Sequence, residues 1–379
     1  MNIHKQPTTL QKLHLLSQDS QYDLSCACGS NDKERRHRSG DDRWVYPAAL
    51  PGSGEKRFLF KTLISNVCSN DCKYCPIRSE RDVPRCSLRP EEVASVFMDY
   101  YTRKKVMGIF LSSGVIGTPD STMDRITAIA RILRKKHKFK GYMHLKIIPG
   151  ASDGAIEEAV SLAGMVSINI ETPGENHFRL LSGRKDYFND VIRPLKYISK
   201  LTGKGMKYSR VKQTTQFVVG AADETDRDIV RYAGGLYNKL KLNRIYFSAY
   251  QRGAGTADLP GEHSLQSNAD LLTREHRLYQ TDFLMRKYRF APEDIPLDRQ
   301  GYLALDIDPK EHWARCHPEF FPINLNRANK YDLLRVPGIG HITVNTILSM
   351  RKEGRRIRRL EDIGRVGKRL EKARGYLCV

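Results

Sequence analysis

Apolar residues along the central part of the chain follow two alternating patterns. Short runs dense in aliphatic and aromatic residues, such as residues 58–65 (FLFKTLIS), predict buried strands. Between these runs, apolar residues recur every three or four positions, as in residues 121–137 (STMDRITAIARILRKKH), and this spacing predicts amphipathic helices. The predicted strands are residues 58–65, 108–114, 141–150, 165–174, 213–221 and 244–251. The predicted helices are residues 90–103, 121–137, 153–164, 190–201, 226–240 and 269–288.

Strict alternation of strand and helix implies parallel strands joined by right-handed crossovers. Six such units can curl into an open barrel, so the predicted fold class is α/β with a partial (β/α)6 barrel. Parallel α/β sheets bind their ligands at the C-terminal ends of the strands. We therefore expect the functional residues directly after each strand.

Composition divides the chain into four segments. Residues 1–45 are polar and charged and are expected to form a loop-rich extension, and residues 46–255 hold the barrel pattern. Residues 256–321 contain several prolines and one predicted helix, which is typical of a connector. Residues 322–379 are predicted to form a small all-helical domain.

The net charge of +21 points to a polyanionic partner, with nucleic acid as the first candidate. The charge is concentrated near the C-terminus, because residues 324–379 hold 14 Lys and Arg against 5 Asp and Glu. No apolar run approaches the roughly 18 residues that a membrane-spanning helix needs. The N-terminus lacks the apolar core of a secretory signal, so we expect a cytoplasmic protein without membrane contact.

Three cysteines follow the first predicted strand at close spacing. Cys68, Cys72 and Cys75 lie in CSNDCKYC, and thiolates at such spacing are ligands for zinc or for iron–sulfur clusters. A structural zinc site needs four ligands, and Cys86 or the distant Cys26 and Cys28 are the candidates for the fourth. A 4Fe–4S cluster held by only three cysteines instead leaves one iron open to a substrate or cofactor.

This CxxxCxxC motif, with Tyr74 just before its last cysteine, resembles the signature of the radical S-adenosylmethionine (SAM) superfamily. The resemblance covers roughly residues 57 to 255. It implies a 4Fe–4S cluster whose open iron binds SAM, and an electron donor of the flavodoxin or ferredoxin type. Reductive cleavage of SAM then yields a 5′-deoxyadenosyl radical that abstracts hydrogen from the substrate, while the protein binds and orients the reactants.

The resemblance also implies a set of cofactor contacts after the later strands. Backbone groups near the methionine amino group, the ribose and the adenine are expected at strand ends, although the usual glycine pair and acidic residue after the second strand are absent. The matching positions are Ser113, Gly114, Asn169, Glu171, Val219, Gly220 and Tyr250. Lys146 and Ala249 are expected on the same side of the barrel, where an ion pair or an ordinary strand end is the alternative.

A tight turn, VPGIG, joins two apolar-faced segments in the C-terminal region. Pro337 ends the first segment, while Gly338 and Gly340 permit a backbone path that exposes successive amides and the next helix N-terminus. Such a turn can bind phosphate without reading bases. The stretch resembles the helix–hairpin–helix motif of DNA repair and uptake proteins, with a weaker second copy around Gly364 and Gly367. We expect Gly338, Gly340, His341 and Arg351 to contact nucleic acid; packing or protein contacts are the alternative.

The barrel and the hairpin together resemble radical SAM proteins assigned to DNA modification or repair. We therefore predict hydrogen abstraction from a base or sugar of DNA. Modification of RNA by the same barrel is one alternative, and a zinc-bearing nucleic-acid-binding protein without catalysis is another. Cys316 is a candidate hydrogen donor, with a packing role as its alternative, and Cys378 is expected to be mobile at the chain end.

Overall fold

The computed structural model describes residues 7–20, 44–49 and 56–379. The chain forms two compact units, the first made of Met1–Glu224 and Gly235–Leu271 and the second of Thr225–Gly234 and Leu272–Val379. This division differs from the four segments expected from composition, because most of the connector belongs to the same unit as the C-terminal helices.

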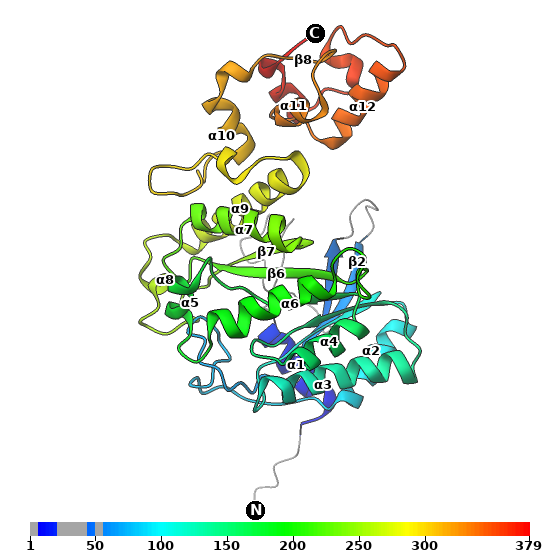
Figure 1. The fold of residues 1–379 in the computed structure, drawn as a ribbon, viewed down its shortest axis with the longest axis vertical. Coiled ribbons are helices and arrows are strands. Elements are labelled where there is room, and N and C mark those ends of the chain that lie inside the picture. Colours follow the sequence, from blue (N-terminus) through cyan, green and yellow to red (C-terminus); the bar gives the residue numbers. More distant parts are fainter. Residues whose placement is uncertain (1–6, 21–43, 50–55) are drawn as a thin grey trace, which may run out of the picture. The chain divides into compact units, whose positions relative to one another are not determined.

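A seven-stranded sheet forms the centre of the first unit, with its strands in chain order from β1 to β7. Strands β2 to β7 are parallel, as predicted, and curl into a half-barrel (Figure 1). β1 was not predicted and pairs antiparallel with β2 at one edge. The strands are β1 (Val45–Ala49), β2 (Lys56–Leu63), β3 (Gly108–Ser112), β4 (Tyr142–Lys146), β5 (Met165–Ser167), β6 (Lys212–Val219) and β7 (Arg244–Ala249).

Helices that follow the strands pack side by side, α2 on α3, α3 on α4 and α4 on α6 (Figure 1). Their apolar stripes are buried against the sheet, as the three- and four-residue spacing predicts. The helices of this series are α2 (Pro90–Thr102), α3 (Pro119–Arg131), α4 (Asp153–Leu162), α5 (Glu175–Leu181), α6 (Arg193–Leu201), α7 (Asp226–Leu240) and α8 (Pro260–His263). A π-helical segment continues α3 (η2, Ile132–Lys136), and another precedes α6 (η3, Tyr187–Ile192).

Alternation along the strands separates the packed face of the sheet from the functional face. In β3, Ile109 and Leu111 are fully buried, whereas Ser112 lines a cavity at the end of the strand. In β6, Val218 lines the same cavity, and its neighbour Val219 is fully buried. The strand ends therefore present one set of alternating side chains to a common site.

The N-terminal extension, which was expected to be loop-rich, contains one helix among its described residues. Residues Thr9–Asp19 form helix α1, which begins with a capping box between Thr8 and Gln11 and packs beside β2. Leu13 and Leu16 are buried, at the three-residue spacing of a helix face. The dense charge further along the extension hid this short amphipathic pattern.

The second unit joins the connector and the C-terminal helices in one core. Arg335 lies over the rings of Phe290 (4.4 Å) and Trp313 (4.5 Å) and pairs with Asp294 at 3.0 Å. The helices are α9 (Asn268–Tyr288), whose first residues belong to the first unit, α10 (Pro309–Cys316), α11 (Lys330–Arg335), α12 (His341–Lys352) and α13 (Lys368–Lys372). The 3-10 turns are η4 (Pro292–Asp294), η5 (Pro318–Phe320), η6 (Leu360–Ile363) and η7 (Arg374–Tyr376).

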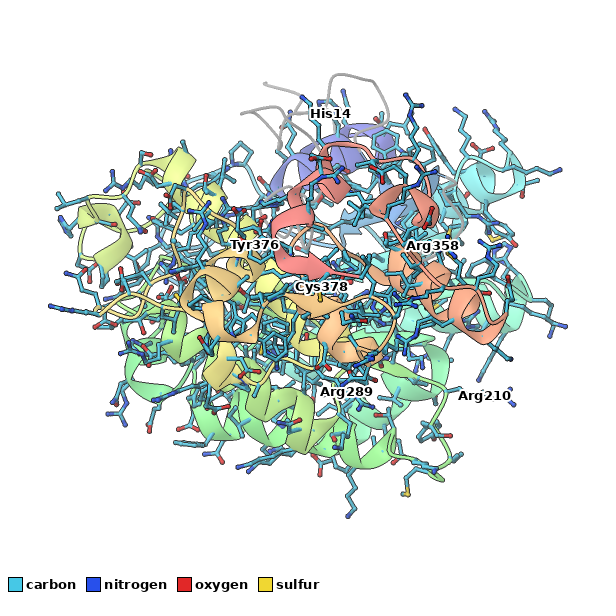
Figure 2. All side chains as sticks on the ribbon, turned by 90° about the horizontal axis from the view of Figure 1, so that it is seen from above. His14, Arg210, Arg289, Arg358, Tyr376 and Cys378 are labelled. Atoms are coloured by element: carbon cyan, nitrogen blue, oxygen red, sulfur yellow. The ribbon has the colours of Figure 1, made fainter. Side chains whose placement is uncertain are left out.

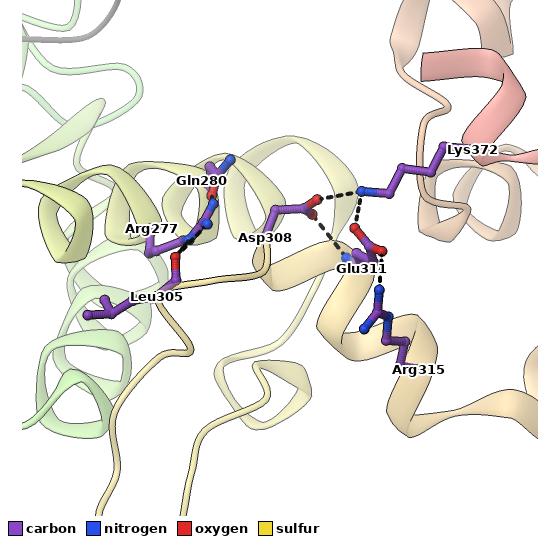
Figure 3. Close-up of polar contacts among 7 residues, drawn as sticks. All are labelled: Arg277, Gln280, Leu305, Asp308, Glu311, Arg315 and Lys372. Atoms are coloured by element: carbon purple, nitrogen blue, oxygen red, sulfur yellow. Dashed lines mark hydrogen bonds and ion pairs between the residues drawn. The ribbon is translucent and has the colours of Figure 1, made fainter. Parts of the chain in front are cut away.

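Two contacts tie the end of the chain to the connector. Lys372 of α13 pairs with Asp308 and Glu311 at the start of α10 (Figure 3). Strand β9 (Leu377–Cys378) pairs in parallel with β8 (Ile323–Asn324). The prediction of a mobile Cys378 is therefore wrong, because the backbone of this residue is part of a ladder.

Over the part of the chain described here, every helix is too short or too polar to cross a bilayer.

Candidate functional site

A cavity lies at the C-terminal ends of the strands in the first unit, where the alternation of strand and helix predicts a site. All three cysteines of the motif line it. Five of the seven residues expected to contact SAM also line it, namely Ser113, Gly114, Asn169, Glu171 and Tyr250, and so do Lys146 and Ala249. The sheet therefore brings together residues that are up to 182 positions apart in the sequence, from Cys68 to Tyr250.

The three thiols are near one another without converging on a single point. Burial raises the pKa of the Cys75 thiol, and negative charge on Cys72 and Cys68 raises it further. Among the described residues, no group of three or more His, Cys, Asp or Glu side chains is placed to hold one metal ion. A 4Fe–4S cluster binds each thiolate through a different iron, so its ligands are spaced more widely than those of zinc. The cavity offers three thiols to such a cluster.

Cys86 does not complete a zinc site at the cavity. Cys86 does not line the cavity, and its thiol instead donates to the carbonyl of Lys12 at 3.8 Å. It lies in the approach to α2, which begins at Pro90. Cys26 and Cys28 lie outside the described residues.

The loop that carries the cysteines is hydrogen-bonded to the turn after β3. The amide of Val115 donates to the Cys68 sulfur at 3.4 Å, and the amide of Ser69 donates to the carbonyl of Val115 at 2.9 Å. Gly114 is required at this turn, because a Cβ there would collide with the carbonyl oxygen of Val67 and lie 3.2 Å from the Cβ of Cys68. The SSG segment thus holds the cysteine loop in place, in addition to its expected role near the cofactor.

Asp71, between the first two cysteines, fixes the loop from the other side. Its carboxylate accepts hydrogen bonds from the Ser182 hydroxyl at 2.5 Å and from the Gly183 amide at 2.9 Å. Burial tends to raise the pKa of Asp71, but these hydrogen bonds outweigh it and hold the pKa below its ordinary value. The segment after α5 is therefore attached to the cysteine loop through an ionised carboxylate.

Arg85 satisfies four backbone carbonyls around the same loop. Its guanidinium donates to Asn66 at 2.5 Å and to Ile77, Arg78 and Arg81 at 2.7 Å each. A planar group with five donors suits this task better than a lysine does. Arg85 accordingly sets the path of the chain after the third cysteine.

Glu171 lies beyond the end of β5 in a strained conformation. Its φ is +65°, in the left-handed region that few non-glycine residues adopt, and its side chain is buried. The Asn169 amide group donates to its carboxylate at 3.5 Å. Strain of this kind persists where surrounding contacts enforce it and is concentrated at functional sites. The expected contact of Glu171 and Asn169 with SAM stays a prediction.

Lys185 lines the cavity, although the sequence reasoning did not identify it. Burial tends to lower the pKa of Lys185, but the charges of Cys72 and Glu171 outweigh it and hold the pKa above its ordinary value. Tyr74 lies beside Glu171. Burial raises the pKa of the Tyr74 hydroxyl, and the negative charge of Glu171 raises it further. Lys185 follows α5, a helix that was not predicted, so no local pattern placed it near a strand end.

Two predicted cofactor contacts do not reach the cavity. The Val219 side chain faces away from it, and the Val219 carbonyl accepts a hydrogen bond from the Tyr250 amide at 2.9 Å. The amide of Gly220 donates to Glu224 at 2.6 Å. Val218 lines the cavity instead, because neighbouring strand residues face opposite sides.

Cys316 ends α10 in the second unit and is exposed, while the cavity is lined by residues of the first unit. Its role as a hydrogen donor stays a prediction.

In the second unit, α11 and α12 flank the VPGIG turn. Gly338 has φ +82°, and a Cβ there would collide with the carbonyl oxygen of Arg369. Gly340 precedes α12, and no side chain caps this helix N-terminus. Arg351 was expected to contact nucleic acid. In the structure its guanidinium donates to the carbonyls of Ala328 at 2.6 Å and Arg327 at 3.3 Å. His341 is half-buried as the first residue of α12.

Several cations near the end of the chain lack a carboxylate partner. Within the described residues, five exposed side chains between positions 356 and 369 form neither an ion pair nor a side-chain hydrogen bond. They are Arg356, Arg358 (labelled in Figure 2), Arg365, Lys368 and Arg369. The weaker second copy of the hairpin carries three of them, although its helix α13 has only five residues.

Comparison with known proteins identifies the barrel. Residues 62–234 match the family model described as the radical SAM superfamily. The chain is 25% identical over 238 residues to the threonylcarbamoyladenosine tRNA methylthiotransferase MtaB of Thermotoga maritima, which covers 60% of this chain and 51% of that protein. The chain thus spans about half the length of the curated relative it matches.

Two solved structures are also similar. One is the FeFe-hydrogenase maturase HydG from Carboxydothermus hydrogenoformans, with 13% identity, 84% of this chain and 76% of that chain covered, and a TM-score of 0.46. The other is methylornithine synthase (PylB), with 14% identity, 74% and 75% covered, and a TM-score of 0.45. The family match supports a radical SAM superfamily domain over residues 62–234, and members of that superfamily use a 4Fe–4S cluster and SAM.

Proposed function

We propose that this protein is a radical SAM enzyme that modifies or repairs DNA, with the hairpin of the second unit binding the DNA backbone. The observation that carries the proposal is the combination of two features in one chain. One is a cavity lined by the three cysteines, and the other is an uncapped helix N-terminus accompanied by five unpaired cations.

Within the cavity, the side chains of this chain have distinct tasks. Cys68, Cys72 and Cys75 would hold the cluster. Glu171 and Lys185 offer opposite charges to the polar parts of SAM. When bound, the cluster and SAM supply an electron and a 5′-deoxyadenosyl group, which together provide the hydrogen-abstracting radical. Apolar lining residues such as Ile148 and Val218 exclude water from the space that remains.

The hairpin suits a phosphate backbone for reasons of electrostatics. The first amides of α12 have no side-chain cap, and the positive end of a 12-residue helix dipole attracts anions. Each phosphate neutralised by one of the unpaired cations releases counterions, so affinity should fall steeply with salt. Gly338 and Gly340 keep the turn free of side chains at this point.

RNA is the second candidate substrate, and a specific observation favours it. The similar protein from Thermotoga maritima is named as a tRNA methylthiotransferase. Backbone binding at the hairpin would serve either polymer, because it contacts phosphates rather than bases.

The test uses the anaerobically reconstituted, reduced protein with SAM and matched oligonucleotides. Flavodoxin or ferredoxin supplies electrons. Mass spectrometry follows 5′-deoxyadenosine release and any mass change in duplex DNA, single-stranded DNA and structured RNA of the same sequence. The proposal expects a mass change in DNA. A mass change confined to RNA establishes the second candidate, and absence of 5′-deoxyadenosine with every substrate overturns the proposal.

A further inference from the structure

Three rings meet beside the hairpin, where the end of α9 approaches the start of α12. Tyr288 and His341 lie 5.0 Å apart edge to face, and Phe283 lies 5.3 Å from Tyr288 and 6.3 Å from His341. Tyr288 is buried and supports the other two rings, whereas Phe283 is 42% exposed. Ile342, directly after His341, is 85% exposed. Apolar surface thus lies next to the uncapped N-terminus of α12.

Positive charges from three helices surround this apolar surface. Burial lowers the pKa of His341, and the charges of Lys330, Lys287 and Lys310 lower it further. Lys287 and Lys330 are exposed, while Lys310 is buried and donates to the carbonyl of Ile339 within the turn at 2.5 Å. Both effects favour the neutral imidazole, which suits a ring that stacks on a base.

Exposed rings flanked by cations are the features with which proteins bind unpaired nucleic acid. The cations follow the backbone, and the rings stack on base faces whatever the sequence. Bases within a duplex present only their edges, so a stacking surface is useful only for a strand that is unpaired or a nucleotide that is flipped out. Enzymes that act on a base must expose it in this way.

We propose that Phe283, His341 and Ile342, flanked by Lys287 and Lys330, form a platform on which an unpaired nucleotide of the bound DNA stacks. The inference rests on the proposed function and specifies it further: the substrate is DNA with a gap, bulge or single strand, and the hairpin holds the adjacent phosphates. Charge complementarity selects this occupant, since the exposed charged side chains that act on His341, Lys287 and Lys330, are both lysines.

The experiment measures binding of the holoprotein to two DNAs of identical sequence, a duplex and a duplex with a three-nucleotide gap. The unpaired strand opposite the gap contains 2-aminopurine, a fluorescent adenine analogue whose emission is quenched by stacking. The wild-type protein is expected to bind the gapped DNA about tenfold more tightly than the duplex and to quench the emission. Phe283→Ala should weaken binding of the gapped DNA about tenfold and abolish the quenching. Phe283→Trp should keep the wild-type affinity and quenching.

Two further variants separate stacking from folding. Ile342→Ser removes a side chain that is mostly in solvent, so the fold should be unchanged and the gapped affinity should fall about threefold. Phe188→Ala is the matched control, because Phe188 is a 54% exposed phenylalanine of the first unit, and it should bind both DNAs as the wild type does.

The outcomes distinguish this platform from the proposed function. Equal binding of gapped and duplex DNA, unaffected by Phe283→Ala, overturns the platform and leaves the proposed function standing. Failure to bind any DNA overturns both. Phe283-dependent quenching with gapped RNA but not with gapped DNA overturns the assignment of the platform to DNA.

Discussion

The charged side chains that hold the loop beside the cavity and a group of cations after α12 differ in the partners they have. Around the cavity of the first unit, each anchoring charge is enclosed by hydrogen bonds: Asp71 accepts from Ser182 and Gly183, and Arg85 donates to four carbonyls. In the second unit, five described cations after α12 make neither ion pairs nor side-chain hydrogen bonds.

On the proposed function, this difference follows from what each unit would bind. A cluster and a small cofactor must be held at fixed positions, which requires side chains whose rotamers are locked by their partners. A phosphate backbone presents many equivalent charges, so long and mobile cations can bind it without an exact register. Locked charges therefore indicate a site of fixed geometry, and unpaired cations indicate a polyanion.

Replacement of a cysteine in the first unit should have the largest effect. Cys72→Ala removes a buried cavity thiol, so the purified protein should lose most of its roughly four iron atoms and cleave SAM at least a thousandfold more slowly. DNA affinity should stay within twofold, because the hairpin belongs to the other unit. Iron and sulfide analysis, 5′-deoxyadenosine release and fluorescence anisotropy measure the three quantities.

Cys86→Ala is the matched control for this loss. The Cys86 thiol contacts the Lys12 carbonyl and does not line the cavity, so this variant should keep its iron. Iron loss in Cys86→Ala equal to that in Cys72→Ala would instead make Cys86 a ligand. One zinc per chain in the wild type, with no sulfide, would revive the zinc alternative.

The sequence predicted most of the sheet because the relevant signals are local. Helix α7 occupies the predicted residues 226–240, and each predicted strand matches one of β2 to β7. The three cysteines were recognisable for the same reason, since their ligand chemistry is contained in eight consecutive residues.

The sequence did not reveal features that depend on contacts between residues far apart in the chain. It also did not reveal which of two neighbouring strand residues faces the cavity. Lys185 reaches the cavity through the attachment of its loop to Asp71, more than a hundred residues earlier. Val218 lines the cavity and Val219 does not, because neighbouring strand residues face opposite sides of the sheet. Composition does not show which of the two valines faces the cavity. Arg351 was expected to bind phosphate from its charge, yet two carbonyls of the preceding segment occupy its guanidinium.

A glycine variant in the second unit should have the next largest effect. Gly338→Ala places a Cβ against the carbonyl of Arg369 at φ +82°, which should lower the free energy of unfolding by about 2–4 kcal/mol. DNA affinity should fall at least tenfold while SAM cleavage persists. Gly354→Ala is the control, because Gly354 has a similar φ of +74° but open space around it. This variant should lower the free energy of unfolding by only about 1 kcal/mol. Equal losses in both variants would contradict a role for close packing at the turn.

Lys310 is a buried cation of the second unit. Burial lowers its pKa to about 7, against about 10.4 in an unfolded chain. Between these values the folded protein binds fewer protons than the unfolded chain, so its free energy of unfolding should rise with pH, by at most about 1.4 kcal/mol per unit. Lys310→Met should remove this rise. Urea unfolding at pH 7, 8 and 9 measures it, and equal slopes for both proteins would show that Lys310 titrates normally.

The smallest effect concerns Glu92, an enclosed charge of the first unit that connects α2 to α1. It accepts hydrogen bonds from the Arg89 amide and the Thr9 hydroxyl, both at 2.7 Å, and pairs with Lys12 at 3.4 Å. Burial tends to raise the pKa of Glu92, but these contacts outweigh it and the pKa lies below its ordinary value. The contribution of the ionised Glu92 carboxylate to the free energy of unfolding should therefore be complete above about pH 4.3. It should be lost as the pH falls through the lowered pKa. Glu92→Gln should cost about 0.5–1 kcal/mol at pH 7 and less at pH 4, whereas the exposed Glu91→Gln should cost nothing measurable. If urea unfolding gave Glu92→Gln the same loss at both pH values, packing rather than charge would hold α1 in place.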